Sequence, residues 1–248
     1  MKPFRTLAET KTPDGSRLTL HEHDGQHYLK LNGRQLMSTD SITSELQLAD
    51  LACTGLHGAA SVRVLIGGLG LGFSLRRVLE LTGRHAKVQV AELLPEVVQW
   101  NREFLQRVNG ALLDEPRVEV VVGDVFTVIR QAQPEWYDAI LLDVDNGPTS
   151  LVQKRNSALY DKRGFGIIKR ALKIGGKVAF WSACPEPIFA NQLKRAGFTV
   201  EAVPAKAHER AKRAAHMIYV GERTLTPETP PASADTGGNA RRRARSAS

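Results

Sequence analysis

The sequence predicts an α/β protein with a Rossmann-like, parallel and doubly wound sheet. From residue 62 onward, short apolar segments alternate with segments of helical periodicity, which is the pattern of repeated strand–helix units. A glycine-rich turn at residues 67–72 directly follows the first apolar segment. Acidic residues stand at or just after the ends of the next three such segments. These observations predict both the fold class and the edge of the sheet where a ligand binds.

The N-terminal part predicts a small β unit followed by a helix, together residues 1–57. Residues 17–21 and 27–31 alternate at a period of two, and Asp24-Gly25 between them is a strong hairpin signal. Asn32-Gly33 supplies a second tight turn before a short strand at 35–37. A helix is expected over residues 42–56, with Ser41 as its N-cap.

Residues 58–223 are expected to form the main domain. The expected strands are residues 62–66, 87–91, 118–122, 137–142, 177–181, 198–203 and 217–220. The expected helices are residues 71–81, 95–107, 125–131, 165–172 and 186–196. The helix at 165–172 is expected to end at Gly175-Gly176. The strand at 137–142 is very apolar and is therefore expected at the centre. No clear helix separates the last two strands, which are expected to form an antiparallel pair at one edge.

Charge and composition exclude several classes of function. Of a formal net charge of +8, a large part comes from arginines in the tail at 224–248 and from the stretch 206–213, so nucleic acid is not expected as a partner. The tail is expected to be disordered and solvated. No run of about 18 apolar residues and no signal peptide are recognised, so we expect a cytoplasmic protein with no membrane partner. Cys53 and Cys184 are expected to be free thiols.

The glycine-rich turn predicts an adenosyl ligand. It follows a strand and opens a helix, and small residues let a ligand approach the backbone and the unpaired N–H groups of the helix N-terminus. The expected binding residues in this turn are Gly67, Gly68, Gly70 and Gly72. A merely tight strand-to-helix turn is the alternative.

Two acidic residues extend the predicted nucleoside site. Glu92 ends the second strand, 20 residues after Gly72, where a carboxylate can accept both ribose hydroxyls. Asp124 follows the third strand, where it can cap the next helix, receive the adenine amino group, or do both. Val125, next in the chain, is included in the predicted cofactor-binding set.

Asp143 and Asp145 are the candidate catalytic residues. Two carboxylates two positions apart on an extended chain point the same way, and beside a cofactor they could bind an amine and accept its proton. Asp-Asn-Gly-Pro at residues 145–148 is also strong turn chemistry, so a turn-forming role stays open. No metal site is predicted, because the histidines at 21, 23 and 27 lack a completing cysteine or acid.

On these residues the sequence resembles the spermidine synthase-like aminopropyltransferases. The resemblance runs from about residue 18 to residue 221 and is carried by the turn at 67–72, Ala91-Glu92, Gly123-Asp124 and residues 137–143. It implies a seven-stranded methyltransferase-type sheet, with Glu92 on the ribose, Asp124 on the adenine and Asp143 near the attacking amine. Tyr160 fits the family's aromatic position and is expected to bind substrate.

The departures from the family are in the same segments. Family members usually carry an aspartate inside the glycine loop, which holds the amino group of decarboxylated S-adenosylmethionine. The corresponding stretch here offers Leu69 or Leu71. The family's Asp-x-x-Asp-Pro segment is shortened, and its Tyr-His-Glu stretch reads Thr43-Ser44-Glu45.

The predicted function is aminopropyl transfer from an S-adenosyl sulfonium to an amine such as a polyamine. The donor is decarboxylated S-adenosylmethionine or S-adenosylmethionine itself, and no metal is required. Three alternatives stay open: methyl transfer from S-adenosylmethionine, an RNA-modifying methyltransferase, and an inactive nucleoside-binding homologue. The expected partner is a small-molecule amine, with a homodimer left open.

Overall fold

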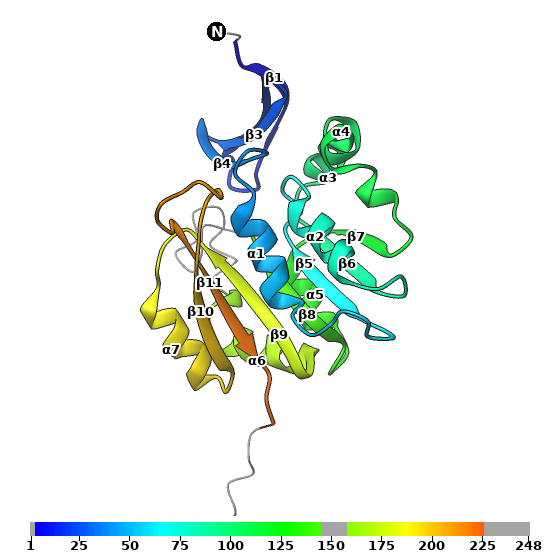
Figure 1. Cartoon of the computed structure of the whole chain (residues 1–248), viewed down its shortest axis with the longest axis vertical. Helices are drawn as coiled ribbons and strands as arrows, with labels where there is room; N and C mark the ends of the chain where they lie inside the picture. Colours follow the sequence, from blue (N-terminus) through cyan, green and yellow to red (C-terminus); the bar gives the residue numbers. More distant parts are fainter. Residues whose placement is uncertain (1–2, 145–157, 226–248) are drawn as a thin grey trace, which may run out of the picture.

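The computed structural model describes residues 3–144 and 158–225 of the 248-residue chain. These residues form two separately hydrogen-bonded sheets, a four-stranded one with the order β1-β2-β3-β4 and a seven-stranded one. Figure 1 shows the small sheet, in blue, at one end of the molecule, with α1 leading from it into the larger body. Asp145 and residues 226–248 lie outside the described residues.

The small sheet is an antiparallel meander at the N-terminus. Its strands are β1 (Arg5–Lys11), β2 (Arg17–His23), β3 (Gln26–Leu31) and β4 (Arg34–Ser38). The two predicted tight turns are confirmed, since Asp24 and Asn32 have φ of 49° and the following Gly25 and Gly33 have φ of 79° and 83°. β1 was not predicted, because it is a largely exposed edge strand with little apolar signal.

The large sheet has the order β10-β11-β9-β8-β5-β6-β7. Its strands are β5 (Arg63–Gly67), β6 (Lys87–Glu92), β7 (Val118–Val122), β8 (Tyr137–Leu142), β9 (Leu172–Ser182), β10 (Thr199–Ala205) and β11 (His216–Glu222). β5 to β9 pair in parallel, whereas β11 is antiparallel to both β9 and β10. The predicted seven-stranded sheet, the central position of β8 and the antiparallel edge pair are therefore confirmed.

Helices cover both faces of this sheet. They are α1 (Thr43–Ala52), α2 (Phe73–Leu81), α3 (Pro95–Glu103), the short α4 (Gln106–Asn109) and η1 (Leu112–Asp114), α5 (Val125–Gln131), α6 (Lys162–Ala171) and α7 (Pro187–Arg195). Strand side chains alternate between two cores: Val64 and Ile66 pack with α1, α2 and α3, whereas Leu65 packs with α5, α6 and α7. None of the helices in the described ranges is long and apolar enough to cross a membrane.

Three local predictions were wrong. The helix expected over 95–107 is broken into α3 and α4, with no glycine or proline in the sequence to signal the break. Ser41 is not a cap: Ile42 stands at the N-cap position without a side-chain cap bond, and the Ser41 hydroxyl donates to the carbonyl of Ala207 at 2.7 Å. Gly175 and Gly176 lie inside β9 rather than at a helix end, because their backbone groups pair with Arg223.

The helix α1 packs against α2 and across β8, β9 and β11 of the large sheet. The sequence placed this helix with the N-terminal unit, residues 1–57. In the structure α1 is the element through which the small sheet joins the larger body. The division of the chain into residues 1–57, 58–223 and 224–248 stays a prediction.

Candidate functional site

A cavity of about 170 Å³ lies between the small sheet and the carboxyl ends of the parallel strands. The small sheet and the loop after β1 contribute Thr12, Leu18, Leu29, Leu31, Leu36 and Met37. The larger body contributes Glu45, Gly68, Gly70, Ala91, Glu92, Leu93, Leu94, Val97, Gly123, Asp124, Val125, Asp143, Val144 and Trp181. The ligand edge predicted from the sequence is therefore the edge that carries the cavity.

The glycine-rich turn is held in a left-handed backbone conformation. Gly68, Gly70 and Gly72 have φ of 88°, 52° and 88°, which residues with a Cβ rarely adopt. A Cβ on Gly68 would collide with the backbone carbonyl of Asp143, and one on Gly70 would lie 2.6 Å from the Met37 Sδ. Of the glycines at residues 67–72, Gly68 and Gly70 line the cavity.

Gly67 and Gly72 are needed for packing around the turn. A Cβ on Gly67 would come within 2.8 Å of Val125, and Gly72 is the N-cap residue of α2. The Asn101 side-chain amide donates to the carbonyl of Gly70 at 2.9 Å, and the Asn109 amide donates to the carbonyl of Leu71. These bonds fix the turn before any ligand is bound.

Glu92 links the turn to the end of β6. One carboxylate oxygen accepts the Leu69 N–H at 2.8 Å and the other accepts the Leu94 N–H at 2.9 Å. Burial raises the pKa of Glu92, and the backbone hydrogen bonds oppose that rise. The carboxylate also lines the cavity, and its role toward the ribose hydroxyls stays a prediction.

Asp124 caps α5, as one of the two predicted roles requires. Its side chain accepts the N–H groups of Phe126 at 3.2 Å and Thr127 at 3.1 Å, and the Thr127 hydroxyl at 2.9 Å. It also lines the cavity together with Gly123 and Val125. The capping bonds fix the carboxylate at the wall, and its role toward adenine stays a prediction.

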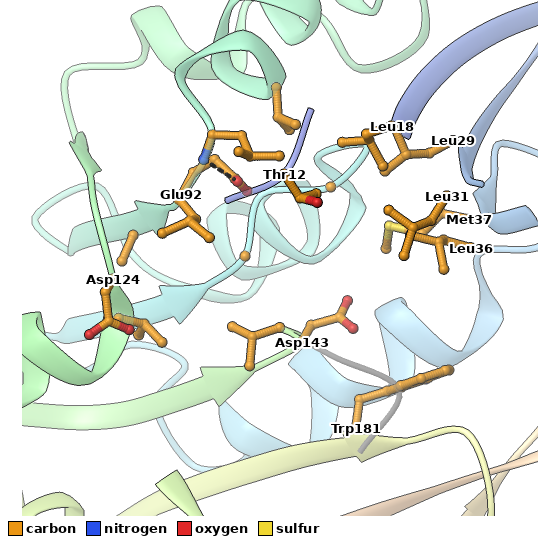
Figure 2. A pocket seen from close by; sticks show the side chains of 18 of the residues that line it. Thr12, Leu18, Leu29, Leu31, Leu36, Met37, Glu92, Asp124, Asp143 and Trp181 are labelled. Atoms are coloured by element: carbon orange, nitrogen blue, oxygen red, sulfur yellow. Dashed lines mark hydrogen bonds between the residues drawn. The ribbon is translucent and has the colours of Figure 1, made fainter. Parts of the chain in front are cut away.

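Asp143 stands in the middle of the cavity. Figure 2 shows Glu92 and Asp124 on one side of it, and its carboxylate points to the other side, toward Leu31, Leu36 and Met37. Burial first, and then the negative charge of Glu45, raise the pKa of Asp143 to about 7. A carboxyl group with this pKa can take up and release a proton near neutral pH.

Glu45 of α1 is a second carboxylate that lines the cavity and acts on Asp143. The sequence interpretation did not include it in the site. It is 6% exposed, and one of its oxygens accepts the Ser44 hydroxyl at 2.7 Å. Burial raises the pKa of Glu45 as well. Its position on the same helical face as Leu48 and Ala49, both buried, is the sequence signal that could have identified it.

Tyr160 does not line the cavity, and Asp145 lies outside the described residues. Tyr160 is 8% exposed and lies in an aromatic cluster with Phe180 and Phe189, at centroid distances of 5.9 and 5.7 Å, and it is not among the residues that line the cavity. Its predicted contact with substrate has no support from this geometry. Asp145 lies outside the described residues, so its catalytic role stays a prediction.

Neither Leu69 nor Leu71 faces the cavity. Both are buried in the core, 5% and 1% exposed, and the turn residue that does face it beyond Gly68 is Gly70. Met37 fills the space beside Gly70. The described turn therefore offers backbone groups and no carboxylate to a bound molecule.

The sheet order, the glycine turn and the acidic residues at successive strand ends define a Rossmann-like α/β protein of the methyltransferase type. Comparison with protein families gives the narrower assignment: residues 48–193, more than half of the chain, match the spermine/spermidine synthase domain. The chain belongs to this family. The resemblance inferred from its motifs is thus confirmed.

Individual relatives are similar over part of their length. The polyamine aminopropyltransferase 1 of Streptomyces coelicolor is 35% identical over 161 residues, which are 63% of this chain and 28% of that protein. The enzyme of the same name from Hyperthermus butylicus is 31% identical, covering 67% and 58%. Putrescine N-methyltransferase 2 of Nicotiana attenuata is 33% identical, covering 47% and 29%. The chain therefore spans about a quarter to somewhat over half of the length of these relatives.

Solved structures show the same fold. A spermidine synthase in complex with the transition state analogue AdoDATO matches with a TM-score of 0.67 and 20% identity, over 90% of this chain and 74% of that one. The spermidine synthase of Thermotoga maritima matches with a TM-score of 0.69 and 18% identity, over 90% and 75%. At this identity the likeness concerns the fold.

Proposed function

We propose that this protein is a transferase that moves an aminopropyl group from decarboxylated S-adenosylmethionine to an amine. The observation that carries the proposal is the position of Asp143, a carboxyl group with a pKa of about 7. It lies between a proposed nucleoside side of the cavity, with Glu92 and Asp124, and the part of the same cavity under the small sheet. The names of the polyamine aminopropyltransferase relatives support the same reaction class.

Different residues of the cavity have different roles in such a transfer. The glycine turn and Glu92 hold the nucleoside, with the ribose hydroxyls donating to the Glu92 carboxylate. Asp143 orients the amine, whose nitrogen lone pair forms a bond to the carbon next to the sulfonium. The carbon–sulfur bond breaks, its electron pair stays on sulfur, and the product is a neutral thioether. Asp143 accepts the proton that the new ammonium releases.

The charge state of Asp143 sets the conditions of the reaction. An amine attacks only in its neutral form, and the new ammonium has to release a proton afterwards. The carboxyl group of Asp143 can accept that proton only when it is ionised. With a pKa of about 7, Asp143 is ionised above neutral pH and still holds a proton well enough to accept one during transfer. Glu45 contributes by raising this pKa, since it places a second negative charge close by.

Methyl transfer from S-adenosylmethionine is the second candidate. It is favoured by the described glycine turn, where no carboxylate faces the cavity and Met37 stands against Gly70. The similarity to a putrescine N-methyltransferase supports the same alternative. Both reactions would use the same nucleoside site and the same base, and they differ in the donor, the group transferred and the thioether that is left.

Calorimetry with S-adenosylmethionine, its decarboxylated form and 5′-methylthioadenosine tests the proposal. We expect the decarboxylated donor and the thioadenosine to bind with Kd below about 1 mM, equivalent to roughly −4 kcal/mol. A clear preference for S-adenosylmethionine would replace aminopropyl transfer by methyl transfer. If no nucleoside binds in this range, the proposed site is wrong for both reactions.

Asp143→Asn tests the role of the base. The variant should lose turnover by at least about 100-fold, a typical contribution of a positioned base, while its affinity for 5′-methylthioadenosine stays within about threefold of the wild type. Unchanged turnover would remove Asp143 from the mechanism. Nucleoside binding by the wild type without transfer to any amine of a broad panel would favour an inactive nucleoside-binding homologue.

A further inference from the structure

Trp181 lines the cavity from the carboxyl end of β9. Figure 2 shows its indole on the far side of Asp143 from Glu92, across the cavity from Met37. The ring is seen edge-on, so one of its faces is turned toward the part of the cavity under the small sheet. A large aromatic face and the carboxyl group of Asp143 therefore border the same part of the cavity.

The indole of Trp181 is held by packing. Its N–H is buried, and no group in residues 3–144 and 158–225 accepts a hydrogen bond from it. The ring packs against the imidazole of His216 at a centroid distance of 4.7 Å and an interplanar angle of 38°. A buried tryptophan usually donates its N–H to an acceptor, so a hydrogen bond does not account for a tryptophan here. What the side chain supplies to the cavity is ring surface.

The imidazole of His216 leaves that ring surface free of positive charge. Burial lowers the pKa of His216 from its ordinary value of 6.5, and a backbone hydrogen bond with Ala183 opposes the change. His216 is therefore neutral near pH 7 and does not repel a cation that approaches the indole. Tryptophan offers the most favourable aromatic face for such a cation, because its ring quadrupole is the strongest.

An aliphatic diamine or polyamine has the chemistry that matches this pair of groups. One of its nitrogens has to be neutral to attack, whereas a second is an ammonium near neutral pH, as a lysine side chain is. An ammonium over the face of an indole is attracted to the ring, more strongly when the contact is shielded from water. The methylenes between the two nitrogens can pack against Leu31, Leu36 and Met37, which line the cavity.

We propose that Trp181 is a specificity-determining residue whose indole face binds the non-reacting ammonium group of a diamine or polyamine acceptor. The proposal rests on the proposed amine transferase function and deepens it. Asp143 orients the nitrogen that attacks, and the indole selects acceptors that carry a second positive charge. Trp181 acts on the binding of the acceptor and takes no part in bond making.

The experiment compares 1,4-diaminobutane with n-pentylamine, in which a terminal methyl replaces the second ammonium. Both amines are titrated by calorimetry into protein saturated with 5′-methylthioadenosine, and the wild type should bind the diamine more tightly. Trp181→Leu keeps an apolar side chain but removes the aromatic face. In this variant the affinity for the diamine relative to n-pentylamine should fall by about 5- to 30-fold, the size of a partly shielded cation–π contact. Trp181→Phe keeps a weaker aromatic face and should give an intermediate ratio.

Trp136→Leu is the matched control. Trp136 is also half-buried and also contacts a cation, since the guanidinium of Arg63 lies 4.0 Å from its ring centroid. It precedes β8 at the amino end of that strand and is not among the residues that line the cavity. Its replacement should leave the affinity ratio within about twofold of the wild type, as expected for a distant site.

Turnover gives a second readout that a purely structural role would not produce. Trp181→Leu should raise KM for the diamine while kcat stays within about threefold of the wild type, because the contact is made equally before and during transfer. Thermal unfolding shows which variants are folded. If leucine prevents folding, Trp181→Phe carries the same comparison with a smaller expected fall in the ratio.

The outcomes separate this proposal from the transferase. Equal losses of affinity for both amines in Trp181→Leu, tighter binding of n-pentylamine by the wild type, or binding of neither amine each overturn the proposal. Transfer to the diamine together with an unchanged affinity ratio overturns the role of Trp181 and leaves the transferase standing. Absence of transfer to either amine, together with the expected fall in the ratio, overturns the transferase and leaves the ammonium site.

Discussion

Asp143→Asn should stabilise the protein at alkaline pH. The pKa of Asp143 is about 7 in the fold, against an ordinary value of 3.8. Between these pH values the folded state holds a proton that the unfolded state has released, so the free energy of unfolding falls as pH rises. The loss is complete above pH 7, when the carboxylate is ionised in both states.

The magnitude follows from the size of the shift. A difference of about 3 pKa units corresponds to about 4 kcal/mol at 1.36 kcal/mol per unit. Water reaches this partly exposed side chain, which reduces the expected effect to about 2 kcal/mol. Asparagine cannot ionise, so the variant should be more stable than the wild type by about 2 to 4 kcal/mol at pH 8 and by close to zero at pH 4.

Urea unfolding of both proteins at pH 4, 6 and 8 measures this difference. The matched control is Asp114→Asn, at an exposed aspartate of η1, which should change the free energy of unfolding by less than about 0.5 kcal/mol at each pH. A variant no more stable than the wild type at pH 8, or equally stabilised at pH 4 and pH 8, would refute the reasoning. Combined with lost turnover, the expected gain would identify Asp143 as a group that costs stability for activity.

Three further predictions concern the site. Because the rate requires an ionised Asp143, log kcat/KM of the wild type should rise with pH up to about 7. In a pH–rate profile, Glu45→Gln should move this rising part to lower pH by about one unit or less, because it removes a negative charge that acts on Asp143. A shift to higher pH would contradict the interaction of Glu45 with Asp143. Gly68→Ala should lower the free energy of unfolding in urea by about 2 kcal/mol or more, because φ is 88° and the Cβ meets the backbone of Asp143. The matched control Gly166→Ala in α6, whose Cβ meets nothing within 4 Å, should be neutral or stabilising by about 0.5–1 kcal/mol. Similar losses in both variants would argue against the strained turn. Glu92→Gln should weaken 5′-methylthioadenosine binding by at least about tenfold in calorimetry, since the amide sets a donor against a backbone N–H; unchanged affinity would remove Glu92 from the nucleoside site.

The large sheet could be predicted because its signals are local. Each strand from β5 to β8 is a short apolar segment next to a helix of the right period, and turn residues or a proline separate them. The glycine turn, Glu92, Asp124 and Asp143 follow from those strand ends, since parallel strands present their carboxyl ends at one edge. The structure brings Gly68, Gly70 and the three acids into the same cavity.

The rest depends on contacts between distant segments. The apolar wall over Asp143 comes from β3 and β4, and nothing local in Leu31, Leu36 or Met37 indicates that they face a cavity rather than a core. Trp181 lies near the carboxyl end of β9, the fifth parallel strand, and therefore at the predicted ligand edge. This position at the end of the strand was the sequence signal that could have identified it as a cavity residue. The partner of Ser41 is Ala207, far along the chain, which is why its local capping signal misled.

Within residues 3–144 and 158–225, the two sheets that wall the cavity share no ladder of backbone hydrogen bonds. A molecule bound there contacts both sheets. Part of its binding free energy therefore stabilises the packing of the small sheet against the large one. Amide protons of β3 and β4 should therefore exchange more slowly with solvent once the cavity is filled, and the small sheet should gain more protection than β8 at the centre of the large sheet. The N-terminal meander then serves as a cover whose attachment strengthens with occupancy.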